Sequence, residues 1–294
     1  MFKKIMKKLF NHDDFKYQKD VHPKDPVFEQ FVPPKGTMRP GDIAWGNTDP
    51  DKDLNTPVKF VAKKKTVLLS TLVLDSISEA SYFYHLAFAY RCGRNVPDYK
   101  FYLASLKRVA IDKARNVIAS QALLQGMEYT FFWDSDTHLH PDLMERMIDV
   151  MERNPDIYAI SPLYRVRGYP FEMMAYIQDG MKPRSITKEE LLKKADADGL
   201  TDVAIVGNGC TLVRTAAYAL WDGPWYKTGA GNTEDAWFCS LLKYQKPDAR
   251  IVVDTTMQCG HEMGDAVAVW EDNVEGLSAM YNPDGGWYRN GIPV

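Results

Sequence analysis

The most constraining stretch of the sequence is an apolar run that ends in two carboxylates. Residues 129–133 are Tyr, Thr, Phe, Phe and Trp, which favour a β-strand, and Asp134, Ser135 and Asp136 follow directly. In an extended chain residues i and i+2 point to the same side, so both carboxylates converge just past the strand. Two such charges repel unless a cation lies between them, and Mg²⁺ or Mn²⁺ shared with phosphates suits this arrangement. A solvated turn is the alternative interpretation of so short a motif.

The composition is that of an ordinary soluble globular protein. The 294 residues suffice for one large domain or two closely associated ones, and 45% of them are hydrophobic. A net charge of -3 argues against a general nucleic-acid binder. The four cysteines have no C-x-x-C spacing, which favours reduced thiols and a cytoplasmic protein. No apolar run has the length of a transmembrane helix, and we expect no secretory signal.

Residues 1–62 differ in composition from the rest of the chain. Residues 1–10 place apolar side chains and lysines on opposite faces of an expected helix. Such a helix suits either a peripheral contact with an anionic membrane surface or docking on the body of the protein. Residues 11–62 are rich in Asp, Lys and Pro, which predicts an extended N-terminal arm with little regular structure.

Strand-like and helix-like segments alternate from about residue 65 to residue 161. We expect strands at 66–74, 99–103, 129–133 and 157–161, and helices at about 75–91, 106–125 and 141–153. The alternation predicts an α/β fold with a mostly parallel sheet and helices on both of its faces. Ligands bind such sheets beyond the carboxyl ends of the strands, where Asp134 and Asp136 are expected.

The pattern becomes less regular after residue 161. We expect an antiparallel strand at 173–177, a polar helix at 185–198, a strand at 203–206, a helix at 233–244 and a strand at 251–254. Residues 266–294 hold aromatic side chains among glycines, including Trp270 and Trp287. This composition predicts an irregular C-terminal tail or flap that folds over a bound ligand.

Four further features stand in a fixed order around the two aspartates. They are Arg115-Asn116 in an expected helix, Gly207-Asn208-Gly209 after an apolar run, Glu234-Asp235 at a helix start, and Gly260-His261. Each has a plain structural interpretation, namely a surface cation, a β-turn, a helix cap and a structural histidine. A carboxylate at a helix N-terminus is, however, stabilised in its ionised form, so it can accept a proton from a hydroxyl group.

In this order the features resemble those of the GT-A glycosyltransferases. The matching residues are 114–116, 132–136, 207–212, 233–235 and 259–261. The resemblance covers roughly residues 65–262. It implies a GT-A catalytic domain at 63–265, with a nucleotide-sugar half at 63–160 and an acceptor half at 161–265 that carries a smaller antiparallel part.

The resemblance also implies a role for each matching residue. Asp136 would coordinate Mn²⁺ or Mg²⁺ bridging the two phosphates of the donor, and His261 would complete the metal site with Asp134, which contacts the ribose or the metal's water shell. Asp235, together with Glu234, would act as the catalytic base or position the acceptor hydroxyl. The residues implied to bind the nucleotide sugar are Thr71, Asp75, Arg115, Asn116, Asp134, Ser135 and Gly209.

The predicted function is transfer of one sugar from a UDP-sugar, or next a GDP-sugar, to an acceptor hydroxyl with inversion. A retaining GT-A enzyme of mannosyltransferase type shares the D-x-D, histidine and glycine features and is an alternative. The acceptor remains open among a glycan, a lipid, a protein and a modified nucleic acid, and so does the oligomeric state.

Three other classes are weighed against this interpretation. Phosphatases of the haloacid dehalogenase class also place D-x-D after an apolar strand, but position 138 is His where they normally have Thr or Val. Nucleotidyltransferases usually follow the first strand with a glycine-rich basic loop, and residues 72–77 contain none. A non-catalytic sugar-binding relative would have less reason to keep Asp136, Asp235 and His261.

Overall fold

The computed structural model describes residues 60–180, 182–229, 233–263, 267–273, 275, 277, 281–282, 286–289 and 292–293. The amphipathic segment predicted at 1–10, and all but the last three residues of the predicted arm at 1–62, lie outside the described residues. Within the described part of the chain, no helix combines the length and the apolar character that crossing a membrane requires.

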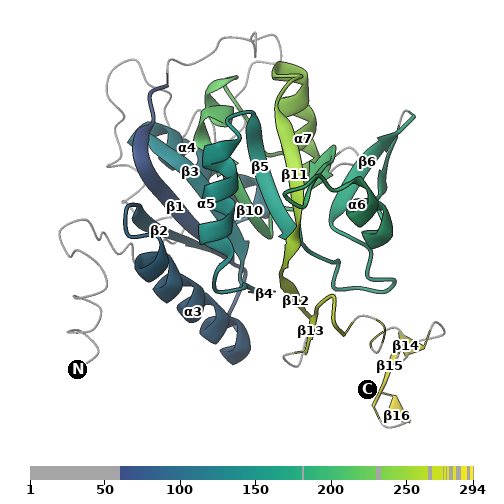
Figure 1. Cartoon of the computed structure of the whole chain (residues 1–294). Helices are drawn as coiled ribbons and strands as arrows, with labels where there is room; N and C mark the ends of the chain where they lie inside the picture. The colour runs from purple at the N-terminus through teal and green to yellow at the C-terminus, as the bar shows by residue number, and fades with distance from the viewer. Residues whose placement is uncertain are drawn as a thin grey trace, which may run out of the picture.

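A seven-stranded sheet in the order β2-β1-β3-β10-β5-β11-β8 forms the centre of the protein (Figure 1). Its strands are β1 (Lys63–Val73), β2 (Lys100–Lys107), β3 (Met127–Asp134), β5 (Ile157–Leu163), β8 (Leu200–Asp202), β10 (Cys210–Arg214) and β11 (Arg250–Gln258). Strands β2, β1 and β3 pair in parallel, as do β5 and β11, while β10 pairs antiparallel with both β3 and β5, and β8 is an antiparallel edge. The carboxyl end of β3 therefore lies between β1 and β10.

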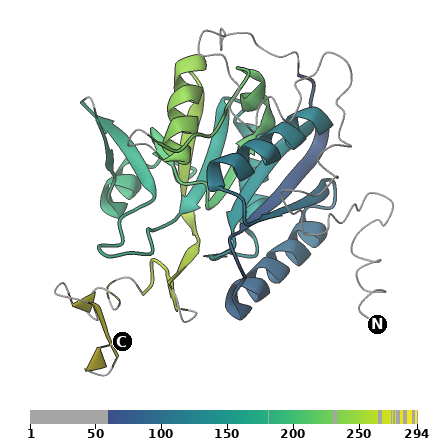
Figure 2. The ribbon, with the colours of Figure 1, turned by 180° about the vertical axis from the view of Figure 1, so that it is seen from behind.

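Helices cover both faces of this sheet. Helices α3 (Glu79–Asn95) and α5 (Leu143–Arg153) pack on one face, where Phe88 and Met147 join Phe131 in one hydrophobic core. Helices α4 (Ile111–Gln125) and α7 (Glu234–Gln245) cover the opposite face, where Ile118 and Phe238 join Phe132 in a second core (Figure 2). Adjacent residues of β3 thus point into different cores. Because both faces of the strand are buried, its sequence is continuously apolar.

Three small antiparallel sheets accompany the central one. They consist of β7-β6-β9, β13-β12-β4 and β14-β15-β16. The bounds of these strands, and of the helices α6 and η3, are β4 (Thr137–His138), β6 (Ala175–Asp179), β7 (Lys182–Ser185), α6 (Lys188–Lys194), β9 (Ile205–Val206), η3 (Thr215–Ala219), β12 (Gly260–Met263), β13 (Val267–Val269), β14 (Tyr281–Asn282), β15 (Gly286–Arg289) and β16 (Ile292–Pro293). The predicted mixed α/β class, with a mostly parallel sheet, helices on both faces and smaller antiparallel parts, is confirmed.

Some element boundaries differ from the sequence-based ones for local reasons. Helix α4 begins at Ile111 and not at 106, because β2 continues to Lys107 in register with Val73. Helix α6 begins after Thr187, whose capping box with Glu190 is present, but it ends well before 198.

Asn116 on α4 links this helix through hydrogen bonds to the turn at residues 225–226, which precedes α7. Its side-chain oxygen accepts hydrogen bonds from the backbone N–H groups of Trp225 and Tyr226 at 2.8 and 3.2 Å. Its side-chain nitrogen donates to the backbone oxygens of Asp112 and Tyr226 at 2.7 and 2.6 Å. The amide therefore has four backbone partners within the protein.

Replacing Asn116 by Ala should lower the free energy of unfolding by about 3 kcal/mol, because buried backbone groups of the 225–226 turn lose their partners. Urea unfolding followed by circular dichroism measures this loss. Asn95→Ala, which removes an amide that donates to Asp142 and Glu145 near the surface, is the matched control and should change stability by about 0.5 kcal/mol or less. Equal losses of stability in the two variants would contradict the inference that Asn116 holds α4 to the 225–226 turn.

Candidate functional site

The two aspartates of the D-x-D motif stand at the carboxyl end of β3. Asp134 is the last residue of the strand, and its backbone N–H donates to the carbonyl oxygen of Gly209 at 2.9 Å. The next N–H, that of Ser135, donates to the carbonyl oxygen of Leu72 on β1 at 3.2 Å. The turn is thus tied to both neighbouring strands, which gives the carboxylates a defined place at the sheet edge.

His261 is brought to Asp136 by the pairing of β12 with β4. In that pairing His261 is opposite Thr137, and the N–H of Glu262 donates to the carbonyl oxygen of Asp136 at 2.8 Å. The His261 Nδ1–H donates to the carbonyl oxygen of Arg165 at 2.9 Å, which directs Nε2 toward Asp136 Oδ2 at 3.5 Å. A backbone acceptor on one ring nitrogen leaves the other free to bind a cation.

Arg167 contributes a positive charge that sequence reasoning did not identify. Its Nη1 lies 2.6 Å from Asp136 Oδ2, and its side chain is 60% exposed. Burial raises the pKa of the Asp136 carboxyl, but the hydrogen bond and charge of His261 and the charge of Arg167 outweigh it, so this pKa is lowered overall. Asp136 is therefore ionised at neutral pH and suited to a metal ion.

The Asp134 carboxylate forms an ion pair with Arg115 at 3.2 Å, and the charges of Asp136 and His261 also act on it. Across the described part of the chain, no three carboxylate, imidazole or thiol groups are gathered as a complete metal site. Asp136 and His261 are two side chains that could hold a cation. Two protein ligands suit an ion such as Mn²⁺ or Mg²⁺ that takes its remaining ligands from water and substrate phosphates.

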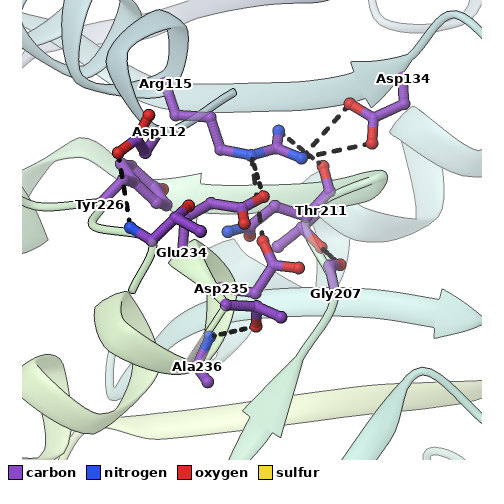
Figure 3. A network of polar contacts seen from close by, with 12 residues as sticks. Asp112, Arg115, Asp134, Gly207, Thr211, Tyr226, Glu234, Asp235 and Ala236 are labelled. Carbon is purple, nitrogen blue, oxygen red and sulfur yellow. Dashed lines mark hydrogen bonds and ion pairs between the residues drawn. The ribbon is translucent and has the colours of Figure 1, made fainter. Parts of the chain in front are cut away.

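Arg115 is the centre of the site's charge network (Figure 3). Its residue is 1% exposed, and its guanidinium lies 5.2 Å from the centre of the Phe132 ring. Nη2 donates to Asp134 at 3.2 Å, Nε donates to Glu234 at 3.3 Å, and Asp235 Oδ1 is 3.9 Å from Nε. One buried cation on α4 thus joins the end of β3 to the start of α7.

The acids around Arg115 differ in how fully they are paired. Burial raises the pKa of Asp134 although Arg115 opposes the rise. Burial also raises the pKa of Asp235, to about 7, with Arg115 again opposing and the charges of Glu234 and Asp134 adding to the rise. Asp235 Oδ1 is buried and has no hydrogen-bond partner in the described part of the chain, so this oxygen is available to a ligand.

The remaining residues predicted to bind the nucleotide sugar lie in different surroundings. Thr71 on β1 is opposite Trp133 on β3. The Thr71 hydroxyl and the Trp133 Nε1 are both buried, and neither has a hydrogen-bond partner within the residues that the structure describes. Trp133 was not foreseen as a site residue, since its type alone predicts core packing. Asp75 is exposed and accepts a hydrogen bond from Arg108 at 2.5 Å.

Gly209 has a packing reason to be glycine. A Cβ added at this position would lie 2.2 Å from the hydroxyl oxygen of Tyr164, a buried residue whose ring centre is 5.0 Å from that of His261. Tyr164 thus fills the space that a side chain at position 209 would need. Gly260 has a similar packing reason to be glycine, because a Cβ at position 260 would lie 2.3 Å from the Trp270 side chain.

The described start of the C-terminal tail is fastened beside His261. Arg165 donates to both carboxylate oxygens of Glu271 at 2.5 and 3.2 Å, and Lys188 lies 2.9 Å from the same carboxylate. The carbonyl of that arginine holds the His261 ring. The tail is thereby linked to the D-x-D end of β3, whereas the side chain of Trp287 lies outside the described residues.

Comparison with protein-family models and with curated proteins finds no match. Several solved structures are similar in fold. A197 from STIV is 16% identical with a TM-score of 0.47, covering 70% of this chain and 91% of that one. GalNAc-T7 with UDP, GalNAc and Mn²⁺ is 12% identical with a TM-score of 0.42, covering 71% of this chain and 44% of that one. UDP-glucose pyrophosphorylase complexed with UDP-glucose is 12% identical with a TM-score of 0.37, covering 65% and 90%. Similarity at this level assigns neither a family nor an activity to the chain.

Asp235→Asn should stabilise the protein in a pH-dependent way. An unfolded chain ionises this carboxyl near pH 3.8, whereas the folded protein keeps its proton until about pH 7. Between these values the folded state binds more protons than the unfolded state, so the wild-type protein loses stability as pH rises. The melting temperature of the variant, relative to wild type, should increase from pH 4 to pH 7 and level off on the order of 5 °C higher.

Differential scanning fluorimetry across this pH range makes the measurement. Asp149→Asn, at an exposed position on α5, is the control and should not reproduce this increase. A difference for Asp235→Asn that stays constant from pH 4 to pH 7 would contradict the buried, proton-retaining carboxyl.

Proposed function

We propose that this protein is a metal-dependent glycosyltransferase that moves a sugar from a nucleoside diphosphate donor to an acceptor hydroxyl with inversion. The observation that carries the proposal is the approach of His261 to Asp136 at the carboxyl end of β3, whose last residue, Asp134, shares the Arg115 guanidinium with Asp235. This edge is where α/β sheets bind ligands. The ordered motifs that resemble GT-A enzymes agree with it and favour UDP over GDP as the nucleotide.

Asp136 and His261 would hold the metal from the protein's side. The imidazole favours Mn²⁺ over Mg²⁺, because Mg²⁺ prefers oxygen ligands. When bound, the ion would neutralise charge that develops on the diphosphate leaving group. Arg167 ion-pairs with Asp136 and is largely exposed, so it can turn from the aspartate to a donor phosphate.

Asp235 would take the proton of the acceptor hydroxyl. One of its oxygens has no hydrogen-bond partner among the described residues, whereas Glu234 accepts a hydrogen bond from Arg115 Nε at 3.3 Å. A carboxyl with a pKa of about 7 is well matched to accepting and releasing a proton near neutral pH. A single free carboxyl on the acceptor side is what direct displacement with inversion requires.

The nucleoside would lie near the end of β1. The Thr71 hydroxyl and the Trp133 Nε1–H lie on adjacent strands and are buried donors for which the described ranges offer no hydrogen-bond partner. A base or ribose oxygen would satisfy them, since buried polar groups are normally hydrogen-bonded. Arg115, whose guanidinium is already occupied by protein carboxylates and the carbonyl of Asn208, would act as a positioning residue for Asp134 and Asp235.

Asp136→Ala should abolish metal-dependent nucleotide binding while leaving the fold intact, because the side chain is 30% exposed at a strand end. Calorimetric titration of UDP and GDP, each with and without Mn²⁺, makes the measurement. We expect Mn²⁺ to strengthen the binding of one nucleotide to the wild-type protein, and the variant to lose about tenfold or more in affinity.

Asp149→Ala is the matched control, since it removes an exposed aspartate that pairs with Arg153 on α5. It should bind nucleotide as wild type does. Metal-dependent binding that survives in Asp136→Ala would refute the metal assignment. A folded wild-type protein that binds neither nucleotide would refute the proposed function.

A further inference from the structure

Asn208 is a buried amide without a partner in the middle of the candidate site. The residue is 0% exposed, and neither Nδ2 nor Oδ1 has a hydrogen-bond partner among the described residues. Buried side-chain amides are almost always paired, because an unpaired one forfeits its hydrogen bonds to water. Such a group indicates a hydrogen-bonding ligand that the protein itself does not supply.

The backbone of Asn208 is fixed by the two groups that define the site. Its carbonyl oxygen accepts from Arg115 Nη1 at 3.2 Å, and its N–H donates to the carboxyl of Asp235. The glycines on either side are enclosed as well, since a Cβ at position 207 would lie 2.6 Å from Met174. The unpaired amide is therefore held in place next to Asp235 and cannot readily turn to solvent.

Charge restricts what can bind beside this amide. Asp134, Glu234 and Asp235 surround Arg115 closely and disfavour a further anion. The Arg115 guanidinium in turn disfavours a cation. The unpaired atoms of the Asn208 side chain are an N–H₂ donor and an amide oxygen acceptor. A neutral group that both donates and accepts hydrogen bonds satisfies both, and adjacent sugar hydroxyls are such a group.

We propose that the Asn208 amide forms a subsite for hydroxyl groups of the donor's sugar, while the unpaired oxygen of Asp235 serves the acceptor hydroxyl. This inference rests on the proposed glycosyltransferase function and adds the part of the donor that Asn208 recognises. The subsite selects among sugars by the position of their hydroxyls, because a hydroxyl that is missing or inverted leaves buried groups unpaired. It does not contribute to the binding of the nucleotide.

The test compares a nucleotide with its sugar conjugates in the presence of Mn²⁺. Affinities of UDP, UDP-glucose, UDP-galactose, UDP-N-acetylglucosamine, GDP and GDP-mannose are measured by calorimetry for the wild-type protein, Asn208→Ala and the isosteric Asn208→Asp. We expect wild type to prefer one sugar conjugate over the bare nucleotide. Both variants should lose about tenfold of that preference and bind the bare nucleotide within about twofold of wild type. Asn154→Ala, at the end of α5, is the control.

Two results would overturn the proposal while the proposed function stands. An unchanged sugar preference in both variants would mean that Asn208 holds a structural water only. Equal losses of affinity for the nucleotide and for its sugar conjugates would mean that Asn208 has only a structural role.

A wild-type protein that binds no nucleotide defeats the proposed function, and a second measurement then decides the subsite. Side-chain amide NMR signals are followed during titration with glucose, galactose, N-acetylglucosamine and mannose. The Asn208 amide signals are identified as the pair that is absent from the spectrum of Asn208→Asp. A shift of this pair on addition of a sugar supports the subsite, and no shift with any of the sugars overturns it.

Discussion

The buried guanidinium of Arg115 is the interaction on which the rest of the site depends. It reaches from α4 to the last residue of β3, to the first residue of α7 and to the carbonyl of Asn208. Asp134, Glu234 and Asp235 could not stand so close together at neutral pH without this cation, because like charges in a buried place repel strongly. Each of these elements belongs to a different part of the chain, so a single side chain assembles the candidate site.

A second set of contacts supports the metal-binding side. The pairing of β12 with β4 sets His261 beside Asp136, and the carbonyl of Arg165 orients its ring. Glu271 holds Arg165 from the tail. Glu262 accepts hydrogen bonds from His138 and from Ser78, the cap of α3. The D-x-D end of β3 is thereby supported both from the C-terminal tail and from the start of α3. This support favours a preorganised site over one formed only on binding.

The sequence predicts what depends on local pattern and misses what depends on distant partners. The apolar run before Asp134 predicts β3, and Gly126 ends α4 in the left-handed conformation, because both signals lie within a few residues. The burial of Arg115 depends on carboxylates up to 120 positions away, and the need for glycine at 209 depends on Tyr164. Asn208, although part of the glycine motif, gives no local sign that its amide is unpaired.

The central claim, that Arg115 keeps a cluster of buried carboxylates in place, is tested most directly by Arg115→Met. The free energy of unfolding of this variant and of wild type is measured with urea at pH 5 and pH 7.5. Without the cation the folded protein retains protons that the unfolded chain releases, so the variant loses stability relative to wild type as pH rises. We predict a deficit of about 3–5 kcal/mol at pH 7.5 and a clearly smaller one at pH 5. The same deficit at both pH values would contradict the account.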